Sequence, residues 1–301
     1  MTKVSFIVPA RNKAKYIEAT VRTVLAQTYS PMEIVLSDQG STDGTLEILQ
    51  RMAAEYKGPN EVRVLQCPLV DYKGMAGLNN HLNWLHTQIT GELVIMCSAD
   101  DFNHPDRAKY TVEAYEKFHP SYIGTCVEYL ENDLSSNGEI TANNHLGDRW
   151  ISPIENINDL VGSSASSCWA RDLYDKYGPL QGVESQDISL PFFGTLERGL
   201  YYVAKPLHAY VRRADPDNTG LEGVVRAAAN KEEEHALVEM CNYHYSSIFM
   251  QLLRRSQQLQ INLTQEVLDA LVNKLIYALN IWTISRDNIT MLKIEPKGMK
   301  V

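Results

Sequence analysis

Two adjacent carboxylates, Asp100 and Asp101, follow an apolar run at residues 93–97 that predicts a buried strand. Two acids at the end of a core strand repel each other unless water, a proton or a cation stabilises them. A divalent cation that holds a phosphate group is one such partner. The alternative is an ordinary loop in which Asp101 caps a helix that begins near Pro105, and the pair alone favours this alternative.

A second acidic loop, residues 38–45, follows another predicted strand at residues 33–37. Its sequence is Asp-Gln-Gly-Ser-Thr-Asp-Gly-Thr, and it begins with Asp38. In an open α/β sheet, ligands bind where the carboxyl ends of neighbouring strands meet. Two neighbouring strands that both end in carboxylates would therefore frame one crevice.

Alternating strands and helices are expected over the first half of the chain, because apolar residues recur there with the spacing of one or the other. Strands are expected at residues 4–8, 33–37, 62–65, 93–97 and 122–127. Helices are expected at about residues 17–25, 45–56, 79–88 and 105–118. This order implies a mainly parallel sheet that is covered by helices on both faces.

The second half is less regular and ends in helices. Residues 128–148 are polar and predict a hairpin. Helices are expected at residues 155–161, at 171–177 and from about 187 to 196, and strands at 201–204 and 207–211. The composition then changes to two long helical stretches, about 231–259 and 263–285. We therefore expect a domain at residues 1–220 and a helical C-terminal extension at residues 221–301.

The segment from Val4 to Asn12, the loop 38–45 and the segment 98–101 resemble, in this order and at these intervals, the family 2 glycosyltransferases. The resemblance covers about the first 220 residues. It implies the GT-A fold, a Rossmann-like sheet flanked by helices. It also implies an inverting transfer of a sugar from a nucleotide-sugar donor.

The resemblance assigns the donor site to the ends of the first, second and fourth strands. In the family, the carboxylate in the place of Asp38 contacts the nucleobase, and an Asp can accept the imide N–H of uracil or thymine. Ser41 and Asp43 either contact the nucleotide or cap the next helix, and Gln39 replaces an acid that relatives often carry. The residues expected to bind the donor are Pro9, Arg11, Asn12, Asp38, Ser41, Asp43 and Asp100.

The metal site is expected at the same edge. The family pattern is commonly Asp-x-Asp-Asp, and Ser98 replaces its first acid here. Asp100 and Asp101 match the positions that bind ribose and metal, so both are expected to hold Mn²⁺ or Mg²⁺ together with diphosphate and water. His81 and His86 lie five apart on a predicted helix, where a surface or core role is expected rather than zinc binding.

The general base is expected at Asp187, where the family usually shows Glu-Asp before a helix. Gln186 replaces that Glu, so Glu184 is the rival base, and the alternative role of Asp187 is to cap the helix. A carboxylate with a pKa of about 4 cannot deprotonate a sugar hydroxyl in advance. The proton should therefore move late, as the new C–O bond forms in a single displacement.

Composition restricts the partners and the compartment. The net charge of −9 argues against general nucleic-acid binding, and the five cysteines show no C-x-x-C pair, as expected of reduced, buried thiols. The sequence shows no leader and no apolar stretch of membrane-spanning length, so a cytoplasmic protein is expected. The C-terminal helices are expected to pack on the domain, with a membrane face or a second subunit as alternative contacts.

The expected activity is the metal-dependent transfer of one sugar to a hydroxyl of a glycan, lipid-linked or other acceptor. A UDP-sugar is the first expected donor, with thymidine and guanosine diphosphate sugars as alternatives. Processive relatives carry Gln-x-x-Arg-Trp after the base, whereas Arg149 and Trp150 precede Asp187 and Leu146 stands at the Gln position. A sugar nucleotidyltransferase is the rival enzyme class, although residues 9–12 are not the Gly-rich loop it would need. Because Ser98 and Gln39 replace acids of the family pattern, an inactive sugar-binding protein is the third hypothesis.

Overall fold

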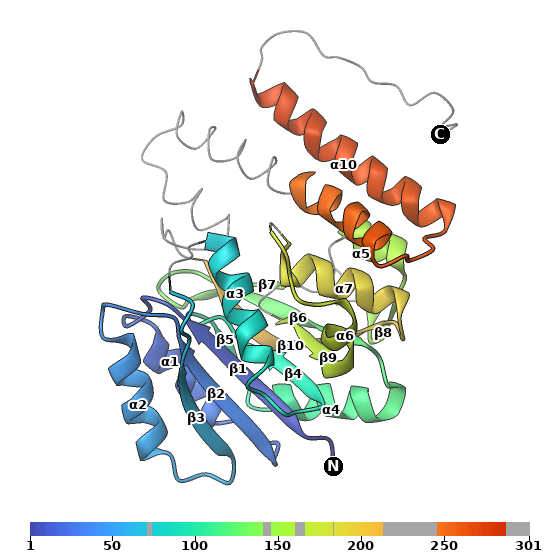
Figure 1. The fold of residues 1–301 in the computed structure, drawn as a ribbon. Helices are drawn as coiled ribbons and strands as arrows, with labels where there is room; N and C mark the ends of the chain where they lie inside the picture. Colours follow the sequence, from blue (N-terminus) through green and yellow to red (C-terminus); the bar gives the residue numbers. More distant parts are fainter. Residues whose placement is uncertain (71–73, 141–145, 160–165, 183, 213–245, 287–301) are drawn as a thin grey trace.

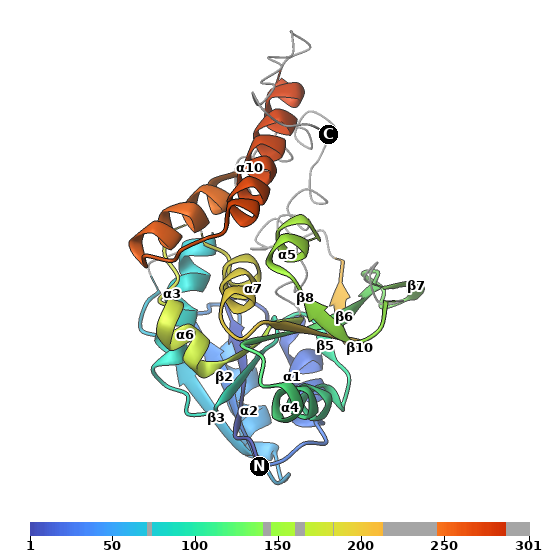
Figure 2. The same cartoon turned by 90° about the vertical axis from the view of Figure 1, so that its right-hand side faces the viewer.

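The computed structural model describes residues 1–70, 74–140, 146–159, 166–182, 184–212 and 246–286. A central sheet carries helices on both faces, and the C-terminal helices lie beyond α7 (Gln186–Leu196) at the end of the molecule away from the N-terminus (Figures 1 and 2). The strands follow the order β3-β2-β1-β4-β9-β6-β10-β5. The expected α/β architecture is therefore present.

The first half of the sheet is parallel, as expected. Its strands are β1 (Val4–Ala10), β2 (Met32–Asp38), β3 (Glu61–Gln66) and β4 (Leu93–Met96). The helices between them are α1 (Ile17–Leu25), α2 (Thr45–Glu55) and α3 (Gly74–His86). Every residue of β1 is buried, because it pairs with β2 on one side and β4 on the other. Burial on both faces explains its nearly continuous apolar sequence.

The second half of the sheet is mixed rather than parallel. Its strands are β5 (Phe102–Asn103), β6 (Tyr122–Leu130), β7 (Ser136–Ile140), β8 (Arg149–Ile151), β9 (Cys168–Ala170) and β10 (Leu200–Val211). β9 is antiparallel to both β4 and β6, whereas β10 runs parallel to β6. The two strands expected at 201–204 and 207–211 form one strand, β10, with an irregular register between Val203 and His208.

The remaining labelled helices are α4 (Arg107–Phe118), α5 (Pro153–Asp159), α6 (Arg171–Tyr177) and α10 (Gln265–Arg286). β6 and β7 confirm the expected hairpin as far as it is described, because they pair antiparallel. Of the helix expected at 231–259, residues 246–258 are described and helical. The expected domain boundary at residue 220 lies outside the described residues.

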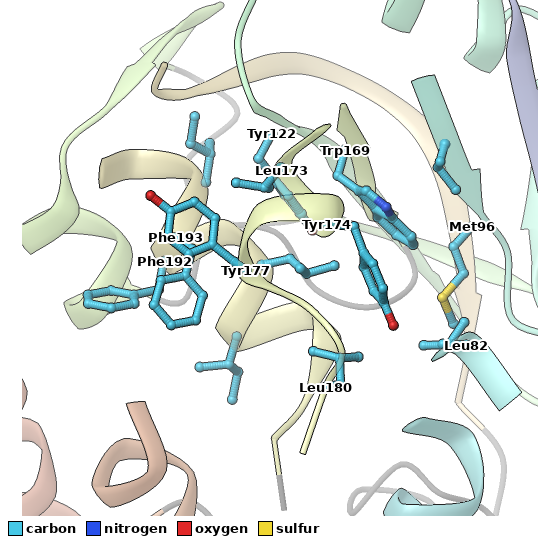
Figure 3. Close-up of a cluster of buried hydrophobic side chains, with 14 of the residues drawn as sticks. Leu82, Met96, Tyr122, Trp169, Leu173, Tyr174, Tyr177, Leu180, Phe192 and Phe193 are labelled. Carbon is cyan, nitrogen blue, oxygen red and sulfur yellow. The ribbon is translucent and has the colours of Figure 1, made fainter. Parts of the chain in front are cut away.

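Two hydrophobic clusters lie on opposite faces of the sheet, because successive residues of a strand point to opposite sides. Val4, Phe6 and Val8 belong to a cluster that includes residues of α1, α2 and α4. Ile7 belongs to the other cluster, which includes α3, α6 and α7 and is rich in aromatic side chains (Figure 3). Ile248, Phe249 and Leu252 join this aromatic cluster. The C-terminal segment therefore shares the core of the preceding domain.

His81 and His86 have the core role that was expected as their alternative to zinc binding. His81 Nε2 lies 2.7 Å from Ser37 Oγ, and burial lowers its pKa to about 4. His86 Nε2 accepts a hydrogen bond from Trp169 Nε1 at 3.1 Å, and burial lowers its pKa to about 3. Both imidazoles are therefore neutral at physiological pH.

The four cysteines in the described part of the chain are buried free thiols, as expected; they are Cys67, Cys97, Cys126 and Cys168. Among the helices that the structure describes, none is both long enough and apolar enough to cross a bilayer.

Candidate active site

Asp38 ends β2, and one of its carboxylate oxygens has no partner among the described residues. Its register partner on β1 is Ala10, and only 2% of the residue is exposed. Oδ2 accepts a hydrogen bond from Ser41 N at 3.0 Å. Oδ1 is buried and has no hydrogen-bond partner among the described residues. A buried carboxylate oxygen without a donor is costly, so this position suits the N–H group of a ligand.

Gln39 connects the loop after β2 to two neighbouring segments. Its Nε2 donates to Leu69 O at 2.8 Å and to Gly77 O at 3.0 Å. Gly40 follows with a φ of +66°, and a Cβ atom there would lie 2.7 Å from Val70 Cγ1. An ionised carboxylate at position 39 could not donate to either carbonyl. The amide is therefore suited to holding the loop after β2 against Leu69 and the first turn of α3.

Asn12, Ser41 and Asp43 join the loop after β1 to the loop after β2. Asn12 N donates to Ser41 Oγ at 2.8 Å, and Asn12 Oδ1 accepts from Thr42 N at 2.9 Å. Asp43 Oδ2 accepts from Ala14 N at 2.9 Å, and its Oδ1 accepts from Thr45 N at 3.0 Å. These hydrogen bonds give the three side chains a role in shaping the edge of the sheet. Direct contact with a nucleotide remains a prediction for each of them.

Pro9 and Arg11 flank the last residue of β1. Pro9 is buried opposite Ser37 of β2, and Arg11 is half-buried directly after the strand. Both lie between the loops that carry Asp38 and Asp100, which is the place where the sequence predicts them.

Asp100 lies after β4 and is reached by the loop after β1. Cys97 N donates to Ile7 O at 3.0 Å, which continues the pairing of β4 with β1 beyond the strand. Lys13 Nζ lies 2.9 Å from Asp100 Oδ2. The segment 11–14 therefore contacts Asp100 on one side and Ser41, beside Asp38, on the other. Both acidic loops belong to one edge of the sheet.

Asp101 is more buried than Asp100 and is held by β10. Its side chain is 2% exposed, against 13% for Asp100. Oδ1 accepts a hydrogen bond from Val211 N at 3.0 Å, and Oδ2 lies 3.3 Å from His208 Nε2. Asp101 therefore anchors the loop to β10 and does not cap α4. Cation binding by both acids stays a prediction, and Asp100, the more exposed of the two, is the first candidate ligand.

Arg107 lies behind this loop as a fully buried cation. Its Nη2 donates to Met96 O at 3.0 Å and to Ser167 O at 3.3 Å. Its Nη1 lies 3.0 Å from His208 Nδ1. Burial and the Arg107 charge lower the pKa of His208 well below its usual value. A neutral His208 that accepts from Arg107 at Nδ1 can donate from Nε2 towards Asp101.

A divalent cation would have few protein ligands here. No group of three or more His, Cys, Asp or Glu side chains in the described part of the chain is arranged to hold a metal. Asp100 supplies one carboxylate at the edge of the sheet. Mg²⁺ sites commonly combine one or two carboxylates with substrate phosphates and water. The residues therefore fit a cation that is bound mainly by a diphosphate.

Asp187 lies in the first turn of α7 and is half-buried. Ser185, the N-cap residue, donates a hydrogen bond from Oγ to Asp187 Oδ1. A negative charge at a helix N-terminus is stabilised by the helix dipole. Gln186 beside it is buried, and neither atom of its amide has a partner among the residues described. The structure thus places Asp187 at the start of α7, as predicted.

Glu184, the rival base, is fully buried. Its Oε2 accepts from Gln181 N at 2.6 Å, and its Oε1 lies 3.8 Å from Arg255 Nε. Burial raises the pKa of Glu184. Glu184 is thus more buried than Asp187, its Oε1 has no hydrogen-bond partner among the described residues, and which of the two acids is the base stays a prediction.

Lys13, His208, Arg107 and Arg255 were not identified from the sequence. Lys13 directly follows the predicted turn at residues 9–12, which is a local signal. The other three are brought in from distant segments.

Sequence comparison places this site in a known family. The Glycosyl transferase family 2 profile matches residues 5–168, more than half of the chain. The chain is 29% identical to an uncharacterized glycosyltransferase of Nostoc sp. over 114 residues, 38% of this chain and 33% of that protein. It is 28% identical to chondroitin synthase of Escherichia coli over 142 residues, 47% of this chain and 19% of that protein. The matched regions span less than half of these relatives.

Solved structures share the fold at low sequence identity. TarS of S. aureus, residues 1–349 in complex with UDP-GlcNAc, superposes with a TM-score of 0.58 at 16% identity, covering 94% of this chain and 87% of that one. The mannosyltransferase PcManGT of Pyrobaculum calidifontis, in complex with GDP-Man and Mn²⁺, gives 0.55 at 19% identity, covering 92% and 75%. These likenesses show the GT-A fold. Together with the family match, they establish that this chain belongs to glycosyl transferase family 2.

Proposed function

We propose that this chain transfers one sugar from a nucleoside diphosphate sugar to a hydroxyl group, with inversion at the anomeric carbon. The observation that carries the proposal is the common edge of Asp38 and Asp100, which the segment 11–14 connects. The complexes of TarS with UDP-GlcNAc and of PcManGT with GDP-Man support a donor of this chemical class.

The free oxygen of Asp38 is suited to reading the nucleobase. Oδ1 is an acceptor with no partner in the described structure, whereas Oδ2 is already bonded to Ser41 N. A single carboxylate acceptor matches the imide N–H of uracil or thymine, and it also matches the ring N–H of guanine. We expect uridine diphosphate sugars first, with thymidine and guanosine diphosphate sugars as alternatives.

Asp100 and Lys13 are the residues placed to organise the diphosphate. Asp100 would hold Mn²⁺ or Mg²⁺, which supplies positive charge to offset the charge that develops on the leaving diphosphate. Lys13, 2.9 Å from Asp100, keeps an ammonium group beside the same position. A cationic side chain there neutralises Asp100 without a ligand and attracts the diphosphate when the donor binds.

Asp187 is proposed as the general base. The acceptor hydroxyl oxygen forms a bond to the anomeric carbon while the bond from that carbon to the diphosphate oxygen breaks. The hydroxyl proton passes to Asp187 late in this step, because the carboxylate is too weak a base to remove it earlier. The nucleoside diphosphate leaves with the bonding electron pair, so the reaction balances without a covalent enzyme intermediate.

A thermal-shift screen tests the donor class directly. UDP-GlcNAc and GDP-mannose are added to the full chain with and without Mn²⁺, and release of nucleoside diphosphate is measured in parallel. A donor that binds the folded state raises the melting temperature by mass action. Asp133→Asn, at an exposed loop residue, should keep the shift that Asp100→Asn loses. Pyrophosphate release from a nucleoside triphosphate and a sugar phosphate, with no turnover of either donor, would instead identify a nucleotidyltransferase.

A further inference from the structure

Arg255 is a buried cation that reaches the loop in front of α7 from the C-terminal segment 246–258. Its Nη2 donates to Tyr177 O at 2.7 Å and to Pro179 O at 3.2 Å. Its Nε lies 3.8 Å from Glu184 Oε1. All three contacts are therefore made with the end of α6 and the loop between α6 and α7, and the last of them, Glu184, lies three residues before Asp187.

Apolar side chains of the C-terminal segment also pack against the domain. Ile248, Phe249 and Leu252 are already buried in the aromatic cluster, whose side chains from α6 and α7 are drawn in Figure 3. A buried guanidinium costs free energy unless its hydrogen-bonding groups and charge are matched. Two hydrogen bonds from Nη2 and the charge of Glu184 supply partners at one place, the loop before α7, while Nε has no hydrogen-bond partner among the described residues.

The opposite side of the same loop is held by α3. Asn79 Nδ2 donates to Glu184 O at 2.7 Å. Asn83 makes two hydrogen bonds with the backbone of Leu180, accepting from its N at 2.9 Å and donating to its O at 3.0 Å. The loop is therefore fixed between α3 and the C-terminal segment.

The start of α7 depends on this loop. Ser189 N donates to Ser185 O at 2.8 Å, and Ser185 Oγ bonds the Asp187 carboxylate. Ser185 directly follows Glu184, so a shift of Glu184 moves the N-cap and the first turn together. Displacements of about 1 Å at a reacting group can lower a rate about a hundredfold.

We propose that Arg255 is a positioning residue of the transfer reaction: it holds Tyr177, Pro179 and Glu184 in place and thereby fixes the first turn of α7, where Asp187 lies. The inference rests on the proposed role of Asp187 as general base. It makes the C-terminal segment 246–258 a working part of the active site, although that segment lies beyond residues 5–168, the part of the chain matched by the family.

Hydrogen–deuterium exchange of the intact chain, without any ligand, tests whether Arg255 holds the loop before α7 in place. Arg255→Met should increase the exchange rate of backbone amides at residues 177–187 at least tenfold, while residues 38–45 exchange as in the wild type. Arg254→Met is the matched control, because Arg254 is the exposed neighbour, and it should change neither segment. In Arg255→Met/Glu184→Gln, part of the protection should return, because no unpaired buried carboxylate is left.

Turnover tests the consequence for the reaction, measured as nucleoside diphosphate release from UDP-GlcNAc and from GDP-mannose with Mn²⁺. Arg255→Met should lower kcat at least tenfold with the donor KM within twofold, and Arg255→Lys should recover part of the loss. Leu252→Val, a core change on the same helix, should lower the melting temperature and leave kcat unchanged. A role confined to stability would make the Arg255 and Leu252 variants behave alike.

Unchanged exchange at residues 177–187 in Arg255→Met, or a loosened loop with wild-type kcat, would overturn the inference. A wild-type chain that turns over neither donor would contradict the proposed function for these donors instead. The exchange comparison would still decide whether Arg255 locks the loop.

Discussion

The donor edge and the loop before α7 are built in different ways. At the donor edge, neighbouring parallel strands bring short motifs together, and the bond from Asn12 to Ser41 joins residues only 29 positions apart. Before α7, the bond from Asn79 to Glu184 joins residues 105 positions apart, and the bond from Arg255 to Tyr177 joins residues 78 apart. Motifs at the ends of parallel strands therefore make the donor edge, even where the bond from Lys13 to Asp100 spans 87 positions, whereas packing between separate helices makes the base side.

The two regions also differ in the groups that they offer to a ligand. The donor edge carries acids that can face a ligand, with one unpartnered oxygen on Asp38 in the described structure. The base side surrounds Glu184 with groups from its own loop and the C-terminal segment, and places Asp187 one helical turn away. Changes at the donor edge should therefore act mainly on donor and metal binding, and changes on the base side on kcat.

The largest effect is expected from Asp187→Asn. Loss of a general base typically lowers a rate about 10²- to 10⁴-fold, and the substitution keeps the size of the side chain. The measurement is nucleoside diphosphate release under saturating donor, with the thermal shift by that donor as the check on binding. Asp133→Asn is the control. A kcat within threefold of the wild type would show that Asp187 is not the general base.

Asp100→Asn and Asp101→Asn test which of the two adjacent carboxylates binds the cation. Asp100→Asn should remove most of the Mn²⁺ dependence and lower turnover about a hundredfold, as expected for a lost charge contact at the reacting diphosphate. Asp101→Asn should instead lower the free energy of unfolding by about 1–3 kcal/mol, because its buried partners Val211 and His208 lose a charged acceptor. Manganese titrations and urea unfolding distinguish the two variants. If Asp101→Asn removed the Mn²⁺ dependence and Asp100→Asn lowered only the free energy of unfolding, Asp101 would be the ligand instead.

Asp38→Asn should weaken donor binding more than it lowers kcat. A hydrogen bond to a charged group contributes about 1.5–3 kcal/mol, so the donor KM should rise about 10- to 150-fold. The kcat at saturating donor should stay within a few fold of the wild type. Equal KM values for the variant and the wild type would show that Oδ1 does not read the base.

The smallest effect on activity is expected from Glu33→Gln at the other end of β2. Burial alone would raise the pKa of Glu33, but hydrogen bonds from Ser5 and Thr90 and contact with Arg63 lower it below the usual value. The folded state thus favours the carboxylate, and this stabilisation is present at neutral pH and is lost as pH falls through the folded-state pKa.

The Glu33→Gln variant should therefore unfold about 1–3 kcal/mol more easily at pH 7, and the difference should shrink in acid. Urea unfolding between pH 7 and pH 3 measures it. A difference that is constant with pH would mean that packing, rather than charge, accounts for the loss.

The sequence predicted the donor edge because strand ends and motifs are local. Asp38 and Asp100 were expected at the ends of neighbouring strands; they follow β2 and β4, which lie on either side of β1 and end at the same edge of the sheet. The contacts of Asp101 with Val211 and His208 could not be predicted, because both residues lie more than a hundred residues away. β9 was missed for the same reason, since its three residues form a strand only through pairing with β4 and β6.

One feature of the sequence indicates that Arg255 is buried. It lies three residues after Leu252 and seven after Ile248, which places it on the apolar face of a helix, whereas Arg254 falls outside that face. An arginine on a buried face predicts a buried partner but does not identify it. The loop it holds becomes known only when the helices are packed.

The central claim is that the edge with Asp38 and Asp100 binds a nucleoside diphosphate together with a divalent cation. Isothermal titration of UDP, and separately of GDP, into the wild-type chain with Mn²⁺ tests this most directly, with Asp38→Asn, Asp100→Asn and Asp187→Asn titrated alongside. The account predicts Mn²⁺-dependent binding of one nucleotide that is weakened at least tenfold in the first two variants and unchanged in Asp187→Asn. Binding of neither nucleotide, or equal affinities in all four proteins, would contradict it.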